Sequence, residues 1–190
     1  MDDTEYCYPN SDILINRLGI KDAALLHNAE RDITSRRLIQ LYDCPVSGRF
    51  GYTHLKRIHK YIFQDIYSWA GEERKVDIAK GNMFCNVLFI PEQAEIIFSD
   101  LLKEKLLQGL SQKDFSDKVA YYISEINALH PFREGNGRAQ REFIRELALH
   151  AGHKIDYSNI TENEMVSASI NSFTKNYEPM ILLMRKAVVL

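Results

Sequence analysis

Apolar residues recur at helical spacing along most of this chain, and one segment breaks that spacing. Glycine and proline, which most often interrupt helices, number nine and five in 190 residues. We therefore expect an all-α fold, a small helical bundle. The spacing predicts helices over about residues 22–41, 53–71, 91–107, 111–128, 136–150, from 161 onward, and 177–188.

Residues typical of helix termini mark several of these boundaries. Thr53 is expected to cap the second helix, which stops at Gly71. Pro91 fits the first turn of the third helix, where the N–H that proline lacks has no acceptor in any case. Thr161 and Glu164 form a capping-box pattern at the start of the sixth helix.

The break in helical spacing lies within residues 74–90. Apolar and polar residues alternate from Arg74 to Ala79, and Lys80-Gly81-Asn82 is a turn signal. The run 87–90, Val-Leu-Phe-Ile, is predicted to return as a second strand. The sequence thus predicts one β-hairpin at about 75–90. A lone hairpin is marginally stable in water, so we expect it to lean on the bundle or on a partner.

The whole chain has the size and composition of one soluble domain, 190 residues with 45% apolar side chains. Its formal net charge of -2 argues against direct nucleic-acid binding, which favours a basic face. The sequence contains no run of 18 apolar residues, so we expect no membrane span. The acidic and polar N-terminus does not resemble a signal peptide. Cys7, Cys44 and Cys85 fit neither a disulfide framework nor a zinc site, so we expect reduced thiols and a cytoplasmic location.

Residues 130–141, His-Pro-Phe-Arg-Glu-Gly-Asn-Gly-Arg-Ala-Gln-Arg, gather the groups needed to hold a polyphosphate and to activate a hydroxyl. Pro131 helps to end the preceding helix and leaves His130 at that end. Free histidine titrates near ~6.5, so His130 can accept the proton of an attacking hydroxyl. Glu134 offers a hard oxygen ligand, the kind that Mg²⁺ combines with phosphates and water.

A helix that begins near Asn136 turns the same segment into an anion site. Gly135 and Gly137 let the backbone turn tightly and let a ligand approach without meeting a Cβ. The free N–H groups at a helix start, together with the helix dipole, attract phosphate. Arg138 and Arg141 are three residues apart, so they lie on one helix face and can both reach bound phosphates.

The segment meets every fixed position of the pattern HPFx(D/E)GNGRxxR and resembles the signature of the Fic family. The resemblance implies a Fic-type helical bundle with an inserted β-hairpin flap, and a single Fic domain over residues 1–190. It also implies an enzyme that transfers AMP from ATP to a hydroxyl side chain of a target protein, releases pyrophosphate and uses Mg²⁺. By this resemblance the base is His130, the metal ligand is Glu134, and the phosphate contacts are Gly135, Asn136, Gly137, Arg138 and Arg141.

The resemblance extends over roughly residues 5–175. The segments 65–71 and 74–78 follow the order seen in stand-alone bacterial Fic proteins. The hairpin corresponds to the family flap. In the family, a segment of the target protein pairs with this flap as an added β-strand, which brings the hydroxyl of the target to the base. Related Doc toxins have a lysine at the place of Gly137 and act as kinases, so Gly137 favours nucleotidyl transfer. The flap residues expected to contact the target are Lys80, Gly81, Asn82, Met83 and Phe84.

Many Fic proteins are inhibited by a helix with the pattern (S/T)xxxE(G/N), whose glutamate pairs with the second arginine of the signature, here Arg141. The match in this chain runs from Ser158 to Asn163 and includes Glu162. We interpret it as a helix start capped by Thr161. The resemblance then implies that a separate small antitoxin presents an inhibitory helix. It further implies a toxin whose target is a type II topoisomerase, such as the ATPase subunit of DNA gyrase or topoisomerase IV.

Two other functions stay open. The same scaffold can use another donor, such as a different nucleotide, phosphocholine or a phosphate, or it can bind nucleotide as a regulatory module without any transfer. The signature keeps all of its functional side chains, which favours an enzyme. The other histidines show no ligand spacing with carboxylates or cysteines and are interpreted as surface or packing residues: His54, His59, His150 and His153.

Overall fold

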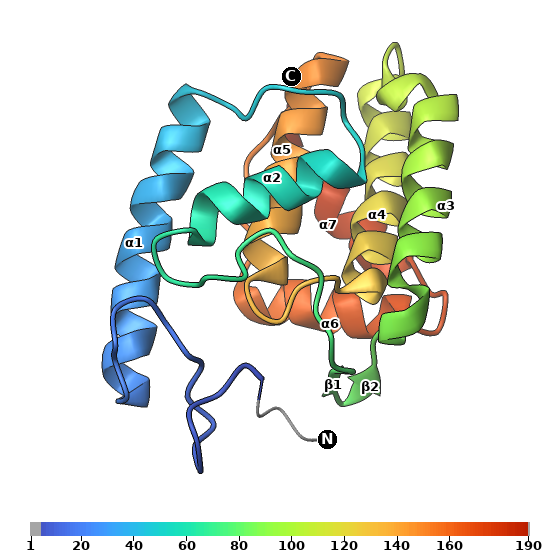
Figure 1. Cartoon of the computed structure of the whole chain (residues 1–190). Helices are drawn as coiled ribbons and strands as arrows, with labels where there is room; N and C mark the ends of the chain where they lie inside the picture. The colour runs from blue at the N-terminus through green and yellow to red at the C-terminus, as the bar shows by residue number, and fades with distance from the viewer. Residues whose placement is uncertain (1–4, 190) are drawn as a thin grey trace.

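The computed structural model describes residues 5–189, and these form a helical bundle (Figure 1). The expected all-α fold is confirmed. The helices are α1 (Ala23–Asp43), α2 (Tyr52–Phe63), α3 (Ile90–Lys103), α4 (Gln112–Leu129), α5 (Asn136–Ala151), α6 (Glu162–Ser172) and α7 (Glu178–Ala187). Two short 3-10 helices, η1 (Val87–Phe89) and η2 (Lys105–Leu107), flank α3.

Two small antiparallel sheets accompany the helices. In the first, β1 (Ala79–Lys80) pairs with β2 (Asn82–Met83), with Ala79 opposite Met83. In the second, β3 (Lys154–Ile155) pairs with β4 (Val188–Val189) and ties the end of α7 to the end of α5. The predicted hairpin is therefore present, and it is shorter than the sequence suggested.

The core lies where α4 packs against α3, α5 and α7, while α2 covers α5. In Figure 1, α1 stands at one side of the bundle, and α6 crosses its lower end near the β1–β2 hairpin. The side chains that fill this core are aromatic and branched aliphatic, and burying each contributes about 1.5–3 kcal/mol. Those with almost no exposure include Ile58, Ile62, Phe63, Phe115, Tyr122, Phe132 and Phe143.

The predicted limits of the second helix are wrong at both ends. Thr53 lies inside α2, and Gly51 takes the N-cap position without a side-chain cap. The helix ends at Phe63, and the chain then turns as far as Gly71, whose φ is +85°. A Cβ on Gly71 would lie 2.8 Å from that of Lys60. Gly71 thus permits a tight return of the chain onto α2, and it marks the end of this turn segment.

The predicted second strand at 87–90 is also wrong, because capping groups turn this segment into a helix. Asn86 accepts a hydrogen bond from the N–H of Leu88 at 3.0 Å. Asp77 accepts another from the N–H of Val87 at 2.8 Å. These N–H groups are therefore taken by side chains, and the chain passes through η1 directly into α3.

Other predicted helix ends are confirmed. Pro91 lies in the first turn of α3. Ser111 caps α4 by accepting a hydrogen bond from Asp114 N at 3.1 Å. Gly152 is the C-cap of α5. Thr161 and Glu164 form the expected capping box at α6.

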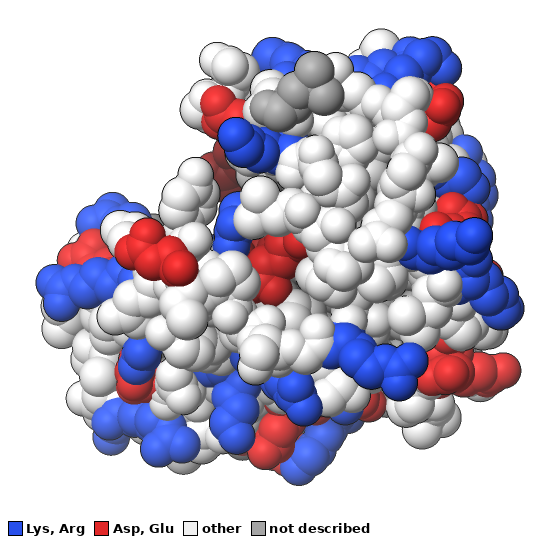
Figure 2. Space-filling model, turned by 90° about the horizontal axis from the view of Figure 1, so that it is seen from above, with Lys and Arg blue, Asp and Glu red and all other residues white. Residues whose placement is uncertain are grey.

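Positive and negative side chains are interspersed over the face shown in Figure 2, without a large field of one sign. The three cysteines are free thiols. None of the helices described between residues 5 and 189 is long and apolar enough to cross a membrane.

Candidate active site

The signature 130–141 forms the turn from α4 into α5, at the lower end of the bundle in Figure 1. His130 is the C-cap of α4 and adopts a left-handed conformation, with φ 46° and ψ 59°. Asn136 closes the turn: its Oδ1 accepts from Phe132 N at 2.9 Å, and its Nδ2 donates to Phe132 O at 2.7 Å. Because the amide of Asn136 is engaged in this way, its backbone N–H is the group left for a ligand.

The ring of His130 is held so that one nitrogen keeps its lone pair. Nδ1 lies 3.3 Å from the carbonyl oxygen of Asn127. A carbonyl only accepts, so Nδ1 carries the proton and Nε2 is left as a base. Phe84 stacks on the ring face, with centroids 3.6 Å apart and planes at 14°. This contact covers one face of the ring and fixes the ring plane.

Burial lowers the pKa of the His130 imidazole to about 3, and the positive charge of Lys80 adds to this effect. The contact with the Asn127 carbonyl acts in the opposite direction. The imidazole is therefore neutral at physiological pH, which is the form that a general base requires.

Arg74, a buried residue outside the signature, holds the backbone of His130 and Pro131 in place. Nothing in the local sequence pattern marks it as part of the site. Arg74 Nε donates to the carbonyl oxygen of His130 at 2.8 Å, and its backbone N–H donates to that of Pro131 at 2.8 Å. Nη1 donates to the Val76 carbonyl at 2.8 Å, and Nη2 to that of Cys85. Arg74 thus joins both arms of the hairpin to the turn that carries His130, and it offsets the cost of a left-handed histidine, about 1–2 kcal/mol.

The start of α5 forms an anion cradle. Gly135 is its N-cap with φ +80°, and no side chain caps the helix. The first-turn N–H groups, those of residues 136–138, therefore point outward without intrahelical acceptors. Both glycines are close-packed: a Cβ on Gly135 would lie 2.1 Å from the Phe63 ring, and one on Gly137 would lie 3.1 Å from Nη1 of Arg141. Phosphate is the ligand such a helix start suits best.

The two predicted phosphate-binding arginines, Arg138 and Arg141, line one cavity of about 560 Å³, with α6 on its far side. Arg141 forms no ion pair with a carboxylate of residues 5–189. Burial lowers its pKa. Next to it lies the hydroxyl of Tyr157, which is buried and has no hydrogen-bond partner in the described part of the chain. A desolvated cation of this kind gains much from an arriving anion.

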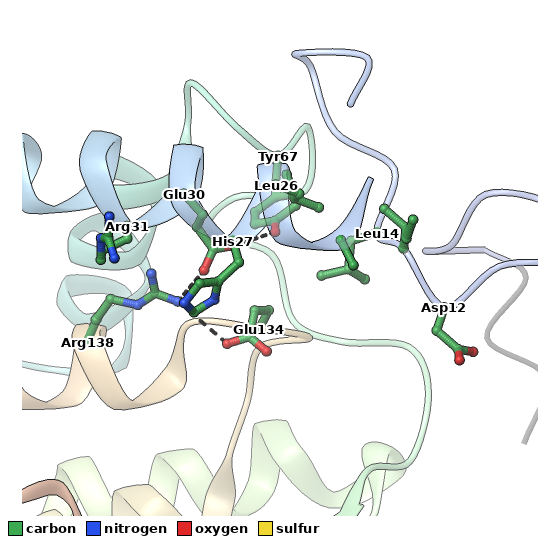
Figure 3. A pocket seen from close by; sticks show the side chains of 11 residues that line it. Asp12, Leu14, Leu26, His27, Glu30, Arg31, Tyr67, Glu134 and Arg138 are labelled. Carbon is green, nitrogen blue, oxygen red and sulfur yellow. Dashed lines mark hydrogen bonds and ion pairs between the residues drawn. The ribbon is translucent and has the colours of Figure 1, made fainter. Parts of the chain in front are cut away.

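Glu134 lies on the other side of Arg138, in a second cavity of about 450 Å³ (Figure 3). Its Oε1 accepts from Gly135 N at 2.7 Å and lies 3.6 Å from Nη2 of Arg138. The side chain is 34% exposed. No group of three or more His, Cys, Asp or Glu side chains that could hold a metal occurs among residues 5–189. A half-buried carboxylate beside a phosphate cradle fits Mg²⁺, which takes its other ligands from phosphates and water.

The predicted flap residues divide into two groups. Lys80, Gly81, Asn82 and Met83 are exposed on the hairpin, where a partner strand can reach them. Phe84 is buried against His130 and lies 5.5 Å, centroid to centroid, from Phe173. Phe84 therefore touches the predicted base, and we do not place it among the exposed target contacts.

Three of the other histidines are packing residues, in line with the expectation of surface or packing roles. His59 is fully buried: it accepts from Gly71 N at 2.8 Å, so its Nε2 donates to the carbonyl of Glu134 at 2.9 Å and anchors the signature turn. His153 is buried as well. His54 is buried too, and it lies 2.6 Å from Glu146, 92 residues away in the sequence. Partners so distant leave no trace in local spacing.

A model of the Fic/DOC family matches residues 49–148, more than half of the chain. Protein adenylyltransferase VbhT from Bartonella schoenbuchensis is 43% identical over 182 residues, which cover 95% of this chain and 38% of that relative. The probable protein adenylyltransferase Fic of Escherichia coli is 40% identical over 82% of this chain and 77% of its own length. This chain thus spans about two fifths of the first relative and about three quarters of the second.

Solved structures agree. The Bartonella tribocorum BepC protein with bound AMPPNP has a TM-score of 0.91 at 27% identity and covers 97% of this chain and 96% of its own. The N-terminal Fic domain of a Bartonella quintana effector with bound ADP has a TM-score of 0.92 at 32% identity, with 97% and 94% covered. Together with the signature turn, these matches show that the chain belongs to the Fic/DOC family.

Proposed function

We propose that this chain is a protein adenylyltransferase, which transfers AMP from ATP to a hydroxyl side chain of a target protein. The observation that carries the proposal is the signature turn itself, in which the neutral His130, with Nδ1 directed at Asn127 O, and the uncapped start of α5 are five residues apart in the chain. The relatives named protein adenylyltransferases, and the related structures with AMPPNP and ADP, support the same reaction.

The reaction that fits this geometry is a displacement at the α-phosphorus. The hydroxyl oxygen of the target bonds to the α-phosphorus while its proton passes to Nε2 of His130. The bond between the α-phosphorus and the oxygen that bridges to the β-phosphorus breaks, and pyrophosphate leaves. The helix-start N–H groups and Arg138 and Arg141 stabilise the negative charge on the phosphates.

Mg²⁺, when bound, would neutralise phosphate charge, and Glu134 is the residue that would hold it. Asn136 contributes its backbone N–H, and Gly135 lets the chain turn into α5 at a point where the Phe63 ring leaves no room for a Cβ. Gly137 also lets Arg141 fold back over the first turn of α5.

The decisive test is transfer of label from α-labelled ATP, with Mg²⁺, to protein in a cell lysate. The wild-type chain should form a covalent AMP adduct, and His130→Ala should lower the rate by at least about 100-fold, the scale of a lost general base. His150→Ala, an exposed histidine at the far end of α5, is the matched control and should keep full activity. Label that persists with His130→Ala would reject the assigned base.

We propose that the target binds along the exposed hairpin residues 80–83 as an added strand, with its hydroxyl directed at His130. The target class that we propose is the ATPase subunit of a type II topoisomerase, DNA gyrase or topoisomerase IV, in the cytoplasm. Mass spectrometry of cell proteins after expression of the wild-type chain, compared with His130→Ala, identifies the target. AMP on unrelated proteins alone would reject the topoisomerase proposal.

We also propose that a separate small antitoxin inhibits the chain with a helix that presents a carboxylate to Arg141. The cavity that holds Arg141 continues into an apolar groove between α1 and α5, lined by Leu38, Ile39 and Tyr42. Ile39 and Tyr42 are 65% and 71% exposed, a surface suited to an amphipathic helix.

Glu162 lines the same cavity as Arg141, and its charge acts to raise the pKa of Arg141, but the two side chains form no ion pair in the described part of the chain. The purified chain alone should therefore be active, and Glu162→Gly should change little. An inactive wild-type chain that Glu162→Gly activates would show that the inhibitor is within the chain.

The alternative donors share the same cradle, so competition separates them. ATP should compete with α-labelled ATP more strongly than other nucleotides or phosphocholine donors do. ATP binding with no covalent product under any of these donors would identify a regulatory nucleotide-binding module.

A further inference from the structure

Arg138 is held by a helix outside the part of the chain that matches the family model. That match covers residues 49–148, whereas α1 spans Ala23–Asp43. From α1, Glu30 Oε1 accepts a hydrogen bond from Nη2 of Arg138 at 2.5 Å, and Thr34 Oγ1 accepts from Nη1 at 3.2 Å. Figure 3 shows Glu30 and Arg138 pointing toward one another, joined by a dashed line, among the side chains that line the cavity.

Glu30 is itself fixed, because both of its carboxylate oxygens are used. Oε1 receives Arg138, and Oε2 receives the hydroxyl of Tyr67. Tyr67 is 1% exposed and lies in the turn segment between α2 and the hairpin. Burial, and next the charge of Glu30, raise the pKa of Tyr67, so its hydroxyl stays protonated and donates. A carboxylate held on both sides is not a mobile group that swings away when phosphate arrives.

The ring of Phe63 completes the support. It lies 4.7 Å from the Arg138 guanidinium carbon, a cation–π contact, and also packs against Gly135. The Glu30 and Arg138 side chains are only 12% and 23% exposed. Charge-assisted hydrogen bonds between partly desolvated groups are strong and directional. The guanidinium has five N–H donors, so two bonds to α1 leave donors for a phosphate.

We propose that Glu30 is a positioning residue for the transfer reaction: with Tyr67 and Thr34 it sets the place and orientation of Arg138 at the phosphate cradle. The proposal rests on the proposed function, because it assumes that Arg138 binds the leaving pyrophosphate part of ATP. It makes α1 part of the nucleotide site, and it assigns the buried Tyr67 hydroxyl a role in that site.

The test compares Glu30→Ala, Glu30→Gln and Tyr67→Phe with Asp32→Asn, an exposed acidic residue of the same helix. Glu30→Ala should lower kcat by about 10- to 100-fold, the scale of a misplaced catalytic contact, and should leave KM for ATP within a few-fold of wild type. Tyr67→Phe should show a smaller loss in the same direction, and Glu30→Gln an intermediate one. Asp32→Asn should match the wild type.

A double-mutant cycle separates positioning from general stability. If Glu30 acts through Arg138, Glu30→Ala should add almost nothing to the loss caused by Arg138→Ala. Additive losses, an unchanged kcat, or a raised kcat would each overturn the proposal. A raised kcat would mean that Glu30 competes with phosphate for Arg138.

A second readout does not depend on catalysis. NMR relaxation of the Arg138 Nε–H group should report an ordered side chain in the wild type and a mobile one in Glu30→Ala. Equal order in both proteins overturns the positioning role even if the chain transfers no AMP. If the wild type is inactive but Glu30→Ala releases Arg138, the proposed function fails and the positioning contact stands.

Discussion

The surroundings of His130 keep its imidazole neutral throughout the physiological pH range. Burial is the main cause of its lowered pKa, and Lys80 on the hairpin adds to it. Removing that cation makes the imidazolium less costly, so Lys80→Ala should move the pKa of His130 upward from about 3 toward ~6.5. An NMR titration of the His130 ring in both proteins measures the shift. A wild-type midpoint near ~6.5, or a Lys80→Ala shift in the opposite direction, would contradict this account.

Two glycines at opposite ends of α5 allow backbone strain to be separated from packing. Gly135 and Gly152 have φ of +80° and +87°, so alanine at either position costs about 1–2 kcal/mol. A Cβ would collide with Phe63 at position 135 and would meet nothing within 4 Å at position 152. Gly135→Ala should therefore destabilise by about 1–3 kcal/mol more than Gly152→Ala.

Urea unfolding of the two glycine variants checks this difference. Phe63→Leu combined with Gly135→Ala should recover part of the stability by relieving the collision. Equal midpoints for Gly135→Ala and Gly152→Ala would mean that the Phe63 contact is unimportant.

The signature residues could be recognised from sequence because they lie within twelve positions of one another. Their supports could not. Glu30 is 108 residues from Arg138, and Arg74 is 56 residues from His130. Local spacing carries no information about such pairs, since only the packing of α1 and of the hairpin base against the turn brings them together.

At the scale of the element, the hairpin is secured at its base rather than along its strands. Each strand has two residues, but Asp77 accepts from Val87 N at 2.8 Å and from Asn86 Nδ2 at 2.9 Å. Asp77 also lies 3.7 Å from the buried Arg74. These contacts explain why the sequence predicted a longer hairpin than the structure has. The residues expected to form its second strand, 87–90, instead form η1 and the start of α3.

Asp77→Ala should loosen the hairpin without disturbing the phosphate cradle. We expect KM for the protein target to rise several-fold while KM for ATP stays the same, because the lost hydrogen bonds contribute about 1–3 kcal/mol to hairpin order alone. Amide hydrogen exchange at residues 79–83 should accelerate in parallel. Glu72→Ala, at an exposed neighbouring carboxylate, is the control. A larger effect on ATP than on the target would show that the hairpin base supports the cradle instead.

At the scale of the whole molecule, the helical bundle followed from periodicity, because a 3.6-residue repeat of apolar positions specifies both helix and buried face. The turns between helices were harder to predict. The stretch 64–71 is apolar enough to continue α2, yet His59 and Gly71 draw it into a tertiary turn. Tertiary hydrogen bonds of this kind override a local helical preference, and they build the wall on which the signature turn rests.

Two buried histidines, His59 and His130, make the fold sensitive to acid. Burial lowers the pKa of both His59 and His130 to about 3, compared with ~6.5 in an unfolded chain. Above ~6.5 both are neutral in either state and contribute no pH dependence. Below it the unfolded chain binds two protons that the folded chain excludes, so each histidine lowers the free energy of unfolding by about 1.4 kcal/mol per pH unit until pH approaches 3.

His130→Ala should lower activity by at least about 100-fold and should also reduce the acid sensitivity of the fold. Between pH 6 and about pH 4, His59 and His130 together make the free energy of unfolding fall as the pH falls, and removing one of them should halve this contribution. Urea unfolding at several pH values measures it. His150→Ala serves again as the control, because His150 is exposed. An unchanged slope in His130→Ala would show that the ring takes up its proton while the chain is still folded, and the neutral, ready base inferred from its burial would have to be given up.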